Sequence, residues 1–97
     1  MEKMNFEYAV SGKVPRRAHV GVVGSGDLEV LLEPSKEGKA SVSIRTSVDG
    51  YGPVWKEVLN RFFSKYQKAA NIEINDFGAT PGTVMLRLEQ AVEVSEA

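Results

Sequence analysis

The sequence contains no cysteine and only one histidine, His19, among its 97 residues. Disulfides, zinc thiolates and protein thiol chemistry are therefore excluded, as is any site built from several imidazoles. Neither sign of charge dominates, because 12 Lys and Arg stand against 13 Asp and Glu, for a net charge of −1. This balance argues against a nucleic-acid binder that relies on a large basic face.

Long hydrophobic runs are also missing. No apolar stretch approaches the ~20 residues that cross a bilayer, and residues 1–6 lack the apolar core of a secretory signal. We therefore expect a cytoplasmic protein with no membrane partner. The length fits one domain, residues 1–97, and a chain of this size can enclose a deep substrate pocket only at the expense of its core. These limits favour a module that presents or binds something over a self-sufficient enzyme.

Much of the chain alternates between apolar and polar residues, the pattern of half-buried strands. Strands are predicted over residues 5–10, 19–23, 28–33, 41–48 and 72–75. Apolar residues recur at three- and four-residue spacing from Val54 to Tyr66, which predicts an amphipathic helix with Pro53 in its first turn. Residues 83–94 fit either a strand or a helix, and Thr80 and Pro81 as cap and first position favour the helix.

Together these elements predict an α+β fold. A small mixed or antiparallel sheet of about four to five strands packs against one or two helices, unlike a four-helix bundle. The aromatic stripe formed by Trp55, Phe62, Phe63 and Tyr66 is expected to lie in the core.

Ser25 is the first candidate functional residue, since it lies between Gly24 and Gly26 at a predicted hairpin tip. Glycine flanks remove neighbouring side chains and permit unusual backbone angles, which leaves the hydroxyl open to another enzyme. The alternative is that serine and glycine are simply common turn residues. A second conspicuous loop, residues 76–82, is equally compatible with recognition and with ordinary turn chemistry.

A catalytic role for Ser25 is disfavoured because a nucleophilic serine needs a base. His19 is the only imidazole, and an extended chain would place it about 20 Å away at ~3.3 Å per residue. The order Gly-x-x-Gly-x-Gly around Ser25 matches neither a dinucleotide fingerprint nor a P-loop. Other charged residues are expected to be solvated, namely Arg16, Arg17, Glu29 and Glu33.

Residues 21–31 (GVVGSGDLEVL) and 76–82 (DFGATPG) resemble the delta subunit of malonate decarboxylase, an acyl carrier subunit. Residues 46–49 (TSVD) and 87–90 (RLEQ) match the same pattern, and the similarity covers essentially the whole chain. The sequence resembles the citrate lyase carrier subunit more distantly. The resemblance implies a non-catalytic carrier subunit of a decarboxylase complex.

The same resemblance implies a prosthetic group, 2′-(5″-phosphoribosyl)-3′-dephospho-CoA, attached to Ser25 through a phosphodiester and ending in a thiol. It implies that acetyl and malonyl groups are carried as thioesters, with a net conversion of malonate to acetate. The partners implied are an acetyl-ACP:malonate transferase subunit, the malonyl-ACP decarboxylase subunits and a holo-ACP synthase. A chain without cysteine is consistent with this, since its own side chains supply no thiol.

Two features of the carrier hypothesis come from the residues themselves. The phosphates of such a group would lie beside Asp27, so we expect the arm to point outward or a partner's basic groups to neutralise the charge. Candidate docking surfaces are residues 78–82 and the helix face carrying Lys56, Arg61 and Lys65. The alternatives are an unmodified scaffold subunit that uses the 76–82 loop, a citrate lyase-type carrier, and, least favoured, a stand-alone hydrolase.

Overall fold

A mixed sheet forms one layer of the structure, a computed structural model that describes residues 1–97. Its strand order is β1-β5-β6-β4-β3, with β2 paired to the start of β6. The strands are β1 (Glu2–Ala9), β2 (Gly12–Lys13), β3 (Ala18–Gly21), β4 (Asp27–Pro34), β5 (Lys39–Thr46) and β6 (Lys68–Phe77). The β5–β6 and β2–β6 pairs are parallel, and the other pairs are antiparallel.

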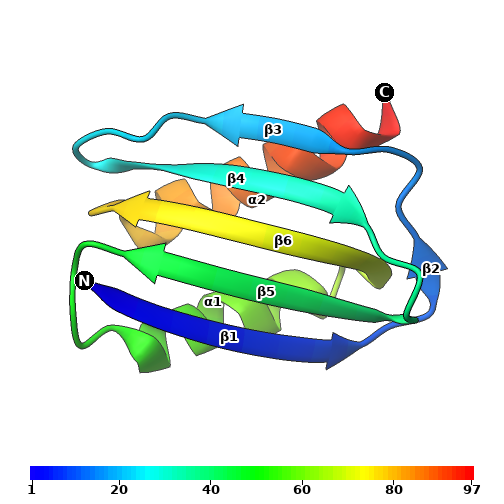
Figure 1. The fold of residues 1–97 in the computed structure, drawn as a ribbon, viewed down its shortest axis with the longest axis horizontal. Coiled ribbons are helices and arrows are strands. Elements are labelled where there is room, and N and C mark those ends of the chain that lie inside the picture. Colours follow the sequence, from blue (N-terminus) through cyan, green and yellow to red (C-terminus); the bar gives the residue numbers. More distant parts are fainter.

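Two helices cover the same face of this sheet (Figure 1). Helix α1 (Gly52–Phe63) connects β5 to β6, and α2 (Pro81–Glu96) follows β6. Each helix carries a proline in its first turn, where the missing N–H has no intrahelical partner to lose. The two-layer α+β prediction is confirmed, and residues 83–94 are helical as the Thr80–Pro81 signal indicated.

One cluster of buried apolar residues lies between the sheet and the helices. The inward positions of β4, namely Leu28, Val30 and Leu32, are fully buried, and they alternate with more exposed neighbours. The aromatic stripe of α1 and the turn after it is buried as predicted, at Trp55, Phe62, Phe63 and Tyr66. Neither helix is long and apolar enough to cross a membrane.

The sheet departs from the sequence-based prediction at several strands. Strand β6 has 10 residues instead of the four expected over residues 72–75. Its first residues include Ala69 and Ala70, which have low β propensity but are buried beside β4 and β2. Gly12 and Lys13, expected in a loop, pair with Lys68 and Ala69.

The strand expected over residues 19–23 ends two residues early, at Gly21. Gly21 has a φ of +82°, which takes the chain out of the extended conformation. Val22 and Val23 follow in the connection to β4, with exposed fractions of 61% and 55%. The segment from Val22 to Gly26 therefore projects beyond the paired strands, and it contains Ser25.

Candidate functional site: the Ser25 turn and its supports

Ser25 occupies the corner of a tight turn between β3 and β4. The Asp27 N–H donates to the Gly24 carbonyl at 3.1 Å, which closes a four-residue turn with Ser25 at its second position. Gly26, at the third position, has a φ of +74°, while Ser25 lies outside the left-handed region. This combination is that of a type II turn, which calls for glycine at the third position.

The Ser25 side chain is exposed, and its hydroxyl forms none of the side-chain hydrogen bonds in the structure. A Cβ added at Gly26 would meet nothing within 4 Å, and one added at Gly24 would meet only the Val22 side chain, at 4.0 Å. The space on both sides of the hydroxyl is therefore open. The neighbouring residues therefore put no side chain next to the hydroxyl.

A backbone hydrogen bond fixes the turn to the end of the neighbouring strand β6. The Gly26 N–H donates to the Phe77 carbonyl at the end of β6, at 2.7 Å. At the base of the hairpin, a Cβ on Gly21 would lie 2.0 Å from the Leu28 carbonyl oxygen. Such a distance is impossible, so glycine is required there for the two strands to approach. The sequence pattern did not indicate this close approach of the strands at Gly21.

A two-point ion pair anchors the residue that follows the turn. Arg87 of α2 donates from Nε to Asp27 Oδ1 at 3.1 Å and from Nη2 to Asp27 Oδ2 at 2.8 Å. The pKa of Asp27 is lowered, first by this hydrogen bonding to Arg87 and then by the Leu28 N–H. Arg87 also donates to Gln90. The negative charge of Asp27 is thus balanced within the chain by Arg87.

A buried carboxylate organises the neighbouring loop. Asp76 is 4% exposed and accepts hydrogen bonds from the Thr46 hydroxyl (2.8 Å) and from the N–H groups of Gly78 (3.3 Å) and Ala79 (3.0 Å). Thr80 then caps α2, its hydroxyl accepting from the Thr83 N–H at 3.2 Å. Sequence reasoning treated residues 76–82 as a loop and did not identify Asp76 as its organising group.

His19 lies on the edge strand β3, where it contacts Glu29 at 2.9 Å from Nε2 to Oε2. Glu29 also accepts from the Asn75 side chain at 2.9 Å, so it belongs to a partly buried network, not to the fully solvated face expected. Arg17 and Glu33 are exposed and form an ion pair at 3.3 Å. None of these residues makes a hydrogen bond to Ser25. None of them is therefore in contact with the hydroxyl as a base.

Comparison with known proteins gives this arrangement its family. The model for "Malonate decarboxylase delta subunit (MdcD)" matches residues 15–95. The chain belongs to this family. Malonate decarboxylase acyl carrier proteins from Stutzerimonas stutzeri strain A1501 and Pseudomonas aeruginosa strain UCBPP-PA14 are 51% and 52% identical over 94 residues, which cover 96% of this chain and 95% of each relative.

A solved structure supports the same assignment to the delta-subunit family. It is a chain from the crystal structure of a Pseudomonas malonate decarboxylase hetero-tetramer in complex with malonate. The match has a TM-score of 0.93 and 49% identity, and it covers 98% of this chain and 99% of that one. Membership of the delta-subunit family makes the protein a carrier-type subunit and not a catalytic one.

Proposed function

We propose that this protein is the acyl carrier subunit of a malonate decarboxylase and that Ser25 is its attachment residue. The observation that carries the proposal is the open, unbonded Ser25 hydroxyl at the corner of a firmly held turn. The prosthetic group is 2′-(5″-phosphoribosyl)-3′-dephospho-CoA, joined through a phosphodiester. Its terminal thiol supplies thioester chemistry for acetyl and malonyl groups, which the side chains of a cysteine-free protein cannot provide.

The residues of the turn fit the attachment of such a group. Gly24 and Gly26 leave room beside the hydroxyl, and Gly26 also allows the turn itself. The new bond forms between Ser25 Oγ and phosphorus of a phosphoanhydride donor, whose bond to its departing phosphate group breaks. Because no base contacts Ser25, the serine proton goes to a base of the modifying enzyme. Residues 1–97 form a single carrier domain in this proposal.

The partners follow from the same role. A holo-ACP synthase modifies Ser25, a transferase subunit exchanges acetyl for malonyl, and the decarboxylase subunits release carbon dioxide. The tethered acyl group is effectively intramolecular at each of these sites. The hetero-tetramer that contains the structural relative supports this placement of the chain in a multisubunit complex.

Substitution of the attachment serine tests the proposal. The chain is produced together with its modifying enzymes as wild type, as Ser25→Ala and as Ser11→Ala, a control in which another exposed loop serine is removed. We expect Ser25→Ala to fold normally by circular dichroism and to accept no acetyl group, while Ser11→Ala is loaded like the wild type. Acetyl loading of Ser25→Ala would contradict the proposal and favour attachment of the carrier group at another residue.

A further inference from the structure

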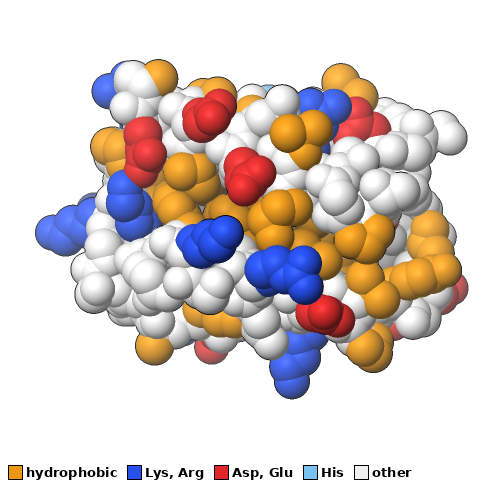
Figure 2. All heavy atoms as spheres, turned by 180° about the vertical axis from the view of Figure 1, so that it is seen from behind, with side chains coloured by type: hydrophobic (Ala, Val, Ile, Leu, Met, Phe, Trp, Pro, Cys, Tyr) orange, Lys and Arg blue, Asp and Glu red, His pale blue; other side chains and the backbone are white.

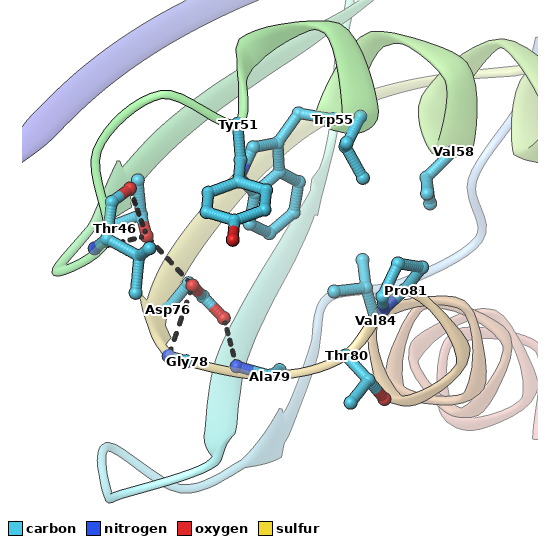
Figure 3. Close-up of a pocket in the computed structure, with 12 residues that line it drawn as sticks. Thr46, Tyr51, Trp55, Val58, Asp76, Gly78, Ala79, Thr80, Pro81 and Val84 are labelled. Atoms are coloured by element: carbon cyan, nitrogen blue, oxygen red, sulfur yellow. Dashed lines mark hydrogen bonds between the residues drawn. The ribbon is translucent and has the colours of Figure 1, made fainter.

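A pocket of about 420 Å³ opens between the first turns of the two helices, beside the Ser25 turn. Figure 3 shows Tyr51, Trp55 and Val58 on one side, with the 78–81 segment and Val84 facing them. The volume lies within the range of small-molecule sites. Trp55 and Val84 are buried by protein atoms alone, with only 5% and 2% of their surface exposed. The core is therefore packed without an occupant in the pocket.

One residue of the pocket lining lies close to the turn that carries Ser25. Gly78 lines the pocket, and a Cβ on it would lie 4.0 Å from the backbone nitrogen of Gly26, the residue after Ser25. The Gly26 N–H is bonded to Phe77, the residue before Gly78. Since Gly78 has no side chain, it places no side-chain atoms between the pocket and the Gly26 backbone. A flexible group bonded to Ser25 therefore has the pocket immediately within reach.

The lining of the pocket selects a particular kind of occupant. Seven of its 12 residues are hydrophobic, and none is Lys or Arg. Its charged member is Asp76, which takes part in none of the ion pairs. A carboxylate offers about four acceptor sites, and Asp76 uses three for Thr46, Gly78 and Ala79. The pocket thus suits an uncharged, mainly apolar segment that brings an amide N–H.

The helical face shows the same character around this region. Exposed apolar side chains gather on the right of Figure 2, the end of the molecule that holds the Ser25 turn and the first turns of both helices. Of the exposed apolar residues, Tyr51 and Val54 line the pocket, and Val22 and Val23 belong to the β3–β4 connection that carries Ser25. Apolar side chains are therefore exposed both in the turn connection and at the pocket.

We propose that this pocket holds the pantetheine end of the Ser25 arm when it carries an acetyl group, and excludes it when it carries a malonyl group. The inference rests on the proposed attachment at Ser25. Pantetheine is a flexible chain with two amides, and an acetylated thiol end is uncharged. A malonyl end adds a carboxylate, which would enter an apolar site whose only charge is the like charge of Asp76, with no cation to pair it. The phosphates stay outside for the same reason.

Trp55, the only tryptophan of the chain, gives a direct readout. The full chain is prepared in apo, acetylated and malonylated forms, each verified by intact mass, and its NMR spectrum is recorded. We expect the Gly26 amide signal to move in both modified forms. The Trp55 indole N–H and the Val84 methyl signals should move in the acetylated form and remain close to apo values in the malonylated form.

Two failures are distinguishable in this experiment. If mass analysis finds no arm on Ser25, the proposed function fails and the inference falls with it. If the arm is present and the Trp55 and Val84 signals of the acetylated form equal those of apo protein, only the inference is overturned. Equal movement in the acetylated and malonylated forms would overturn the charge selection.

A blocking substitution provides an independent check. Val58→Phe fills the pocket from α1, and Val94→Phe adds the same bulk at an exposed position near the end of α2, outside the pocket. We expect the acetyl group of Val58→Phe to be cleaved by hydroxylamine several-fold faster than that of wild type, while Val94→Phe behaves like wild type. Equal cleavage rates in all three proteins would contradict sheltering in the pocket.

Discussion

Arg87 holds Asp27 through two hydrogen bonds although 60 residues separate them in the chain. The contact joins α2 to the first residue of β4, which is also the last residue of the Ser25 turn. A planar guanidinium that meets a carboxylate at two points fixes orientation as well as distance. The position of the turn relative to the second helix is thereby set within the chain.

The Asp27–Arg87 pair predicts a specific pH dependence of stability. Because the pKa of Asp27 is lowered from its ordinary value of 3.8, the pair stabilises the folded state above that pH. The contribution is lost as pH falls through the lowered pKa, where the folded-state carboxyl takes up its proton. We expect Arg87→Gln to unfold at lower urea than wild type at neutral pH, and the difference to vanish in acid.

The control for this prediction is Arg17→Gln, which removes an ion pair with Glu33 whose side chains are 79% and 57% exposed. Such exposed pairs contribute little, so its urea midpoint should match that of wild type at both pH values. A loss in Arg87→Gln that is the same at neutral and acid pH would show that the arginine acts through packing and not through the charge of Asp27.

Glycines of the hairpin are predicted to differ sharply in their tolerance of alanine. Gly21→Ala combines a left-handed φ with a Cβ that would lie 2.0 Å from the Leu28 carbonyl oxygen, so we expect a loss of about 3 kcal/mol or more. Gly26→Ala has the unfavourable φ but free space, and about 1 kcal/mol is expected. Urea unfolding measures both, and equal losses would contradict the steric account.

Gly24→Ala completes this series, because Gly24 lies outside the left-handed region and its added Cβ would touch only the edge of Val22. We expect a change within about 0.5 kcal/mol, as for ordinary exposed positions. Gly24→Ala should also slow the modification of Ser25, because it places a methyl group beside the hydroxyl. We expect a clear decrease in the loading rate together with a nearly unchanged stability. Comparison of loading rate with the urea midpoint separates access from folding.

Removal of the Asp76 carboxylate should destabilise the loop that leads into α2. Asp76→Ala leaves the buried Thr46 hydroxyl and two N–H groups without their acceptor, and we expect a loss of roughly 1–3 kcal/mol. Asp76→Asn keeps one acceptor oxygen and should lose less. Hydrogen exchange of the Gly78 and Ala79 amides provides the local readout. Unchanged protection in Asp76→Ala would show that the carboxylate does not organise the loop.

The cap of α2 gives a smaller and cleaner prediction. Thr80→Ala removes the hydroxyl that accepts from the Thr83 N–H, and loss of such a cap costs about 1 kcal/mol. Thr80→Ser retains the hydroxyl and should be close to wild type in thermal unfolding. If both variants lose the same stability, the methyl group of Thr80 matters and the cap does not.

Local patterns predicted most of the secondary structure. Alternation in the residues of β4 and β5 and the helical spacing from Val54 onward directly reflect burial on one face, which is a property of neighbouring residues. The last segment required the Thr80–Pro81 signal, since apolar spacing alone fitted a strand as well. Each of those features is encoded within a few neighbouring residues, so the sequence alone was sufficient to predict it.

Longer-range relationships were not accessible from one sequence. The full length of β6 depends on neighbours that bury Ala69 and Ala70, and β2 exists only because Gly12 and Lys13 meet the start of β6. The Arg87–Asp27 pair and the Asp76 network join residues brought together by the fold. In each case the residue types were visible, but no local pattern indicates which distant group they contact.

Intact mass spectrometry of the protein isolated from its native host, grown on malonate, tests the central claim most directly. The account predicts a mass increment larger than that of phosphopantetheine, mapped to the peptide that contains Ser25. A phosphopantetheine-sized increment would retain the carrier role but contradict the proposed group. An unmodified chain, taken from cells that are actively consuming malonate, would contradict the carrier account and favour a scaffold subunit.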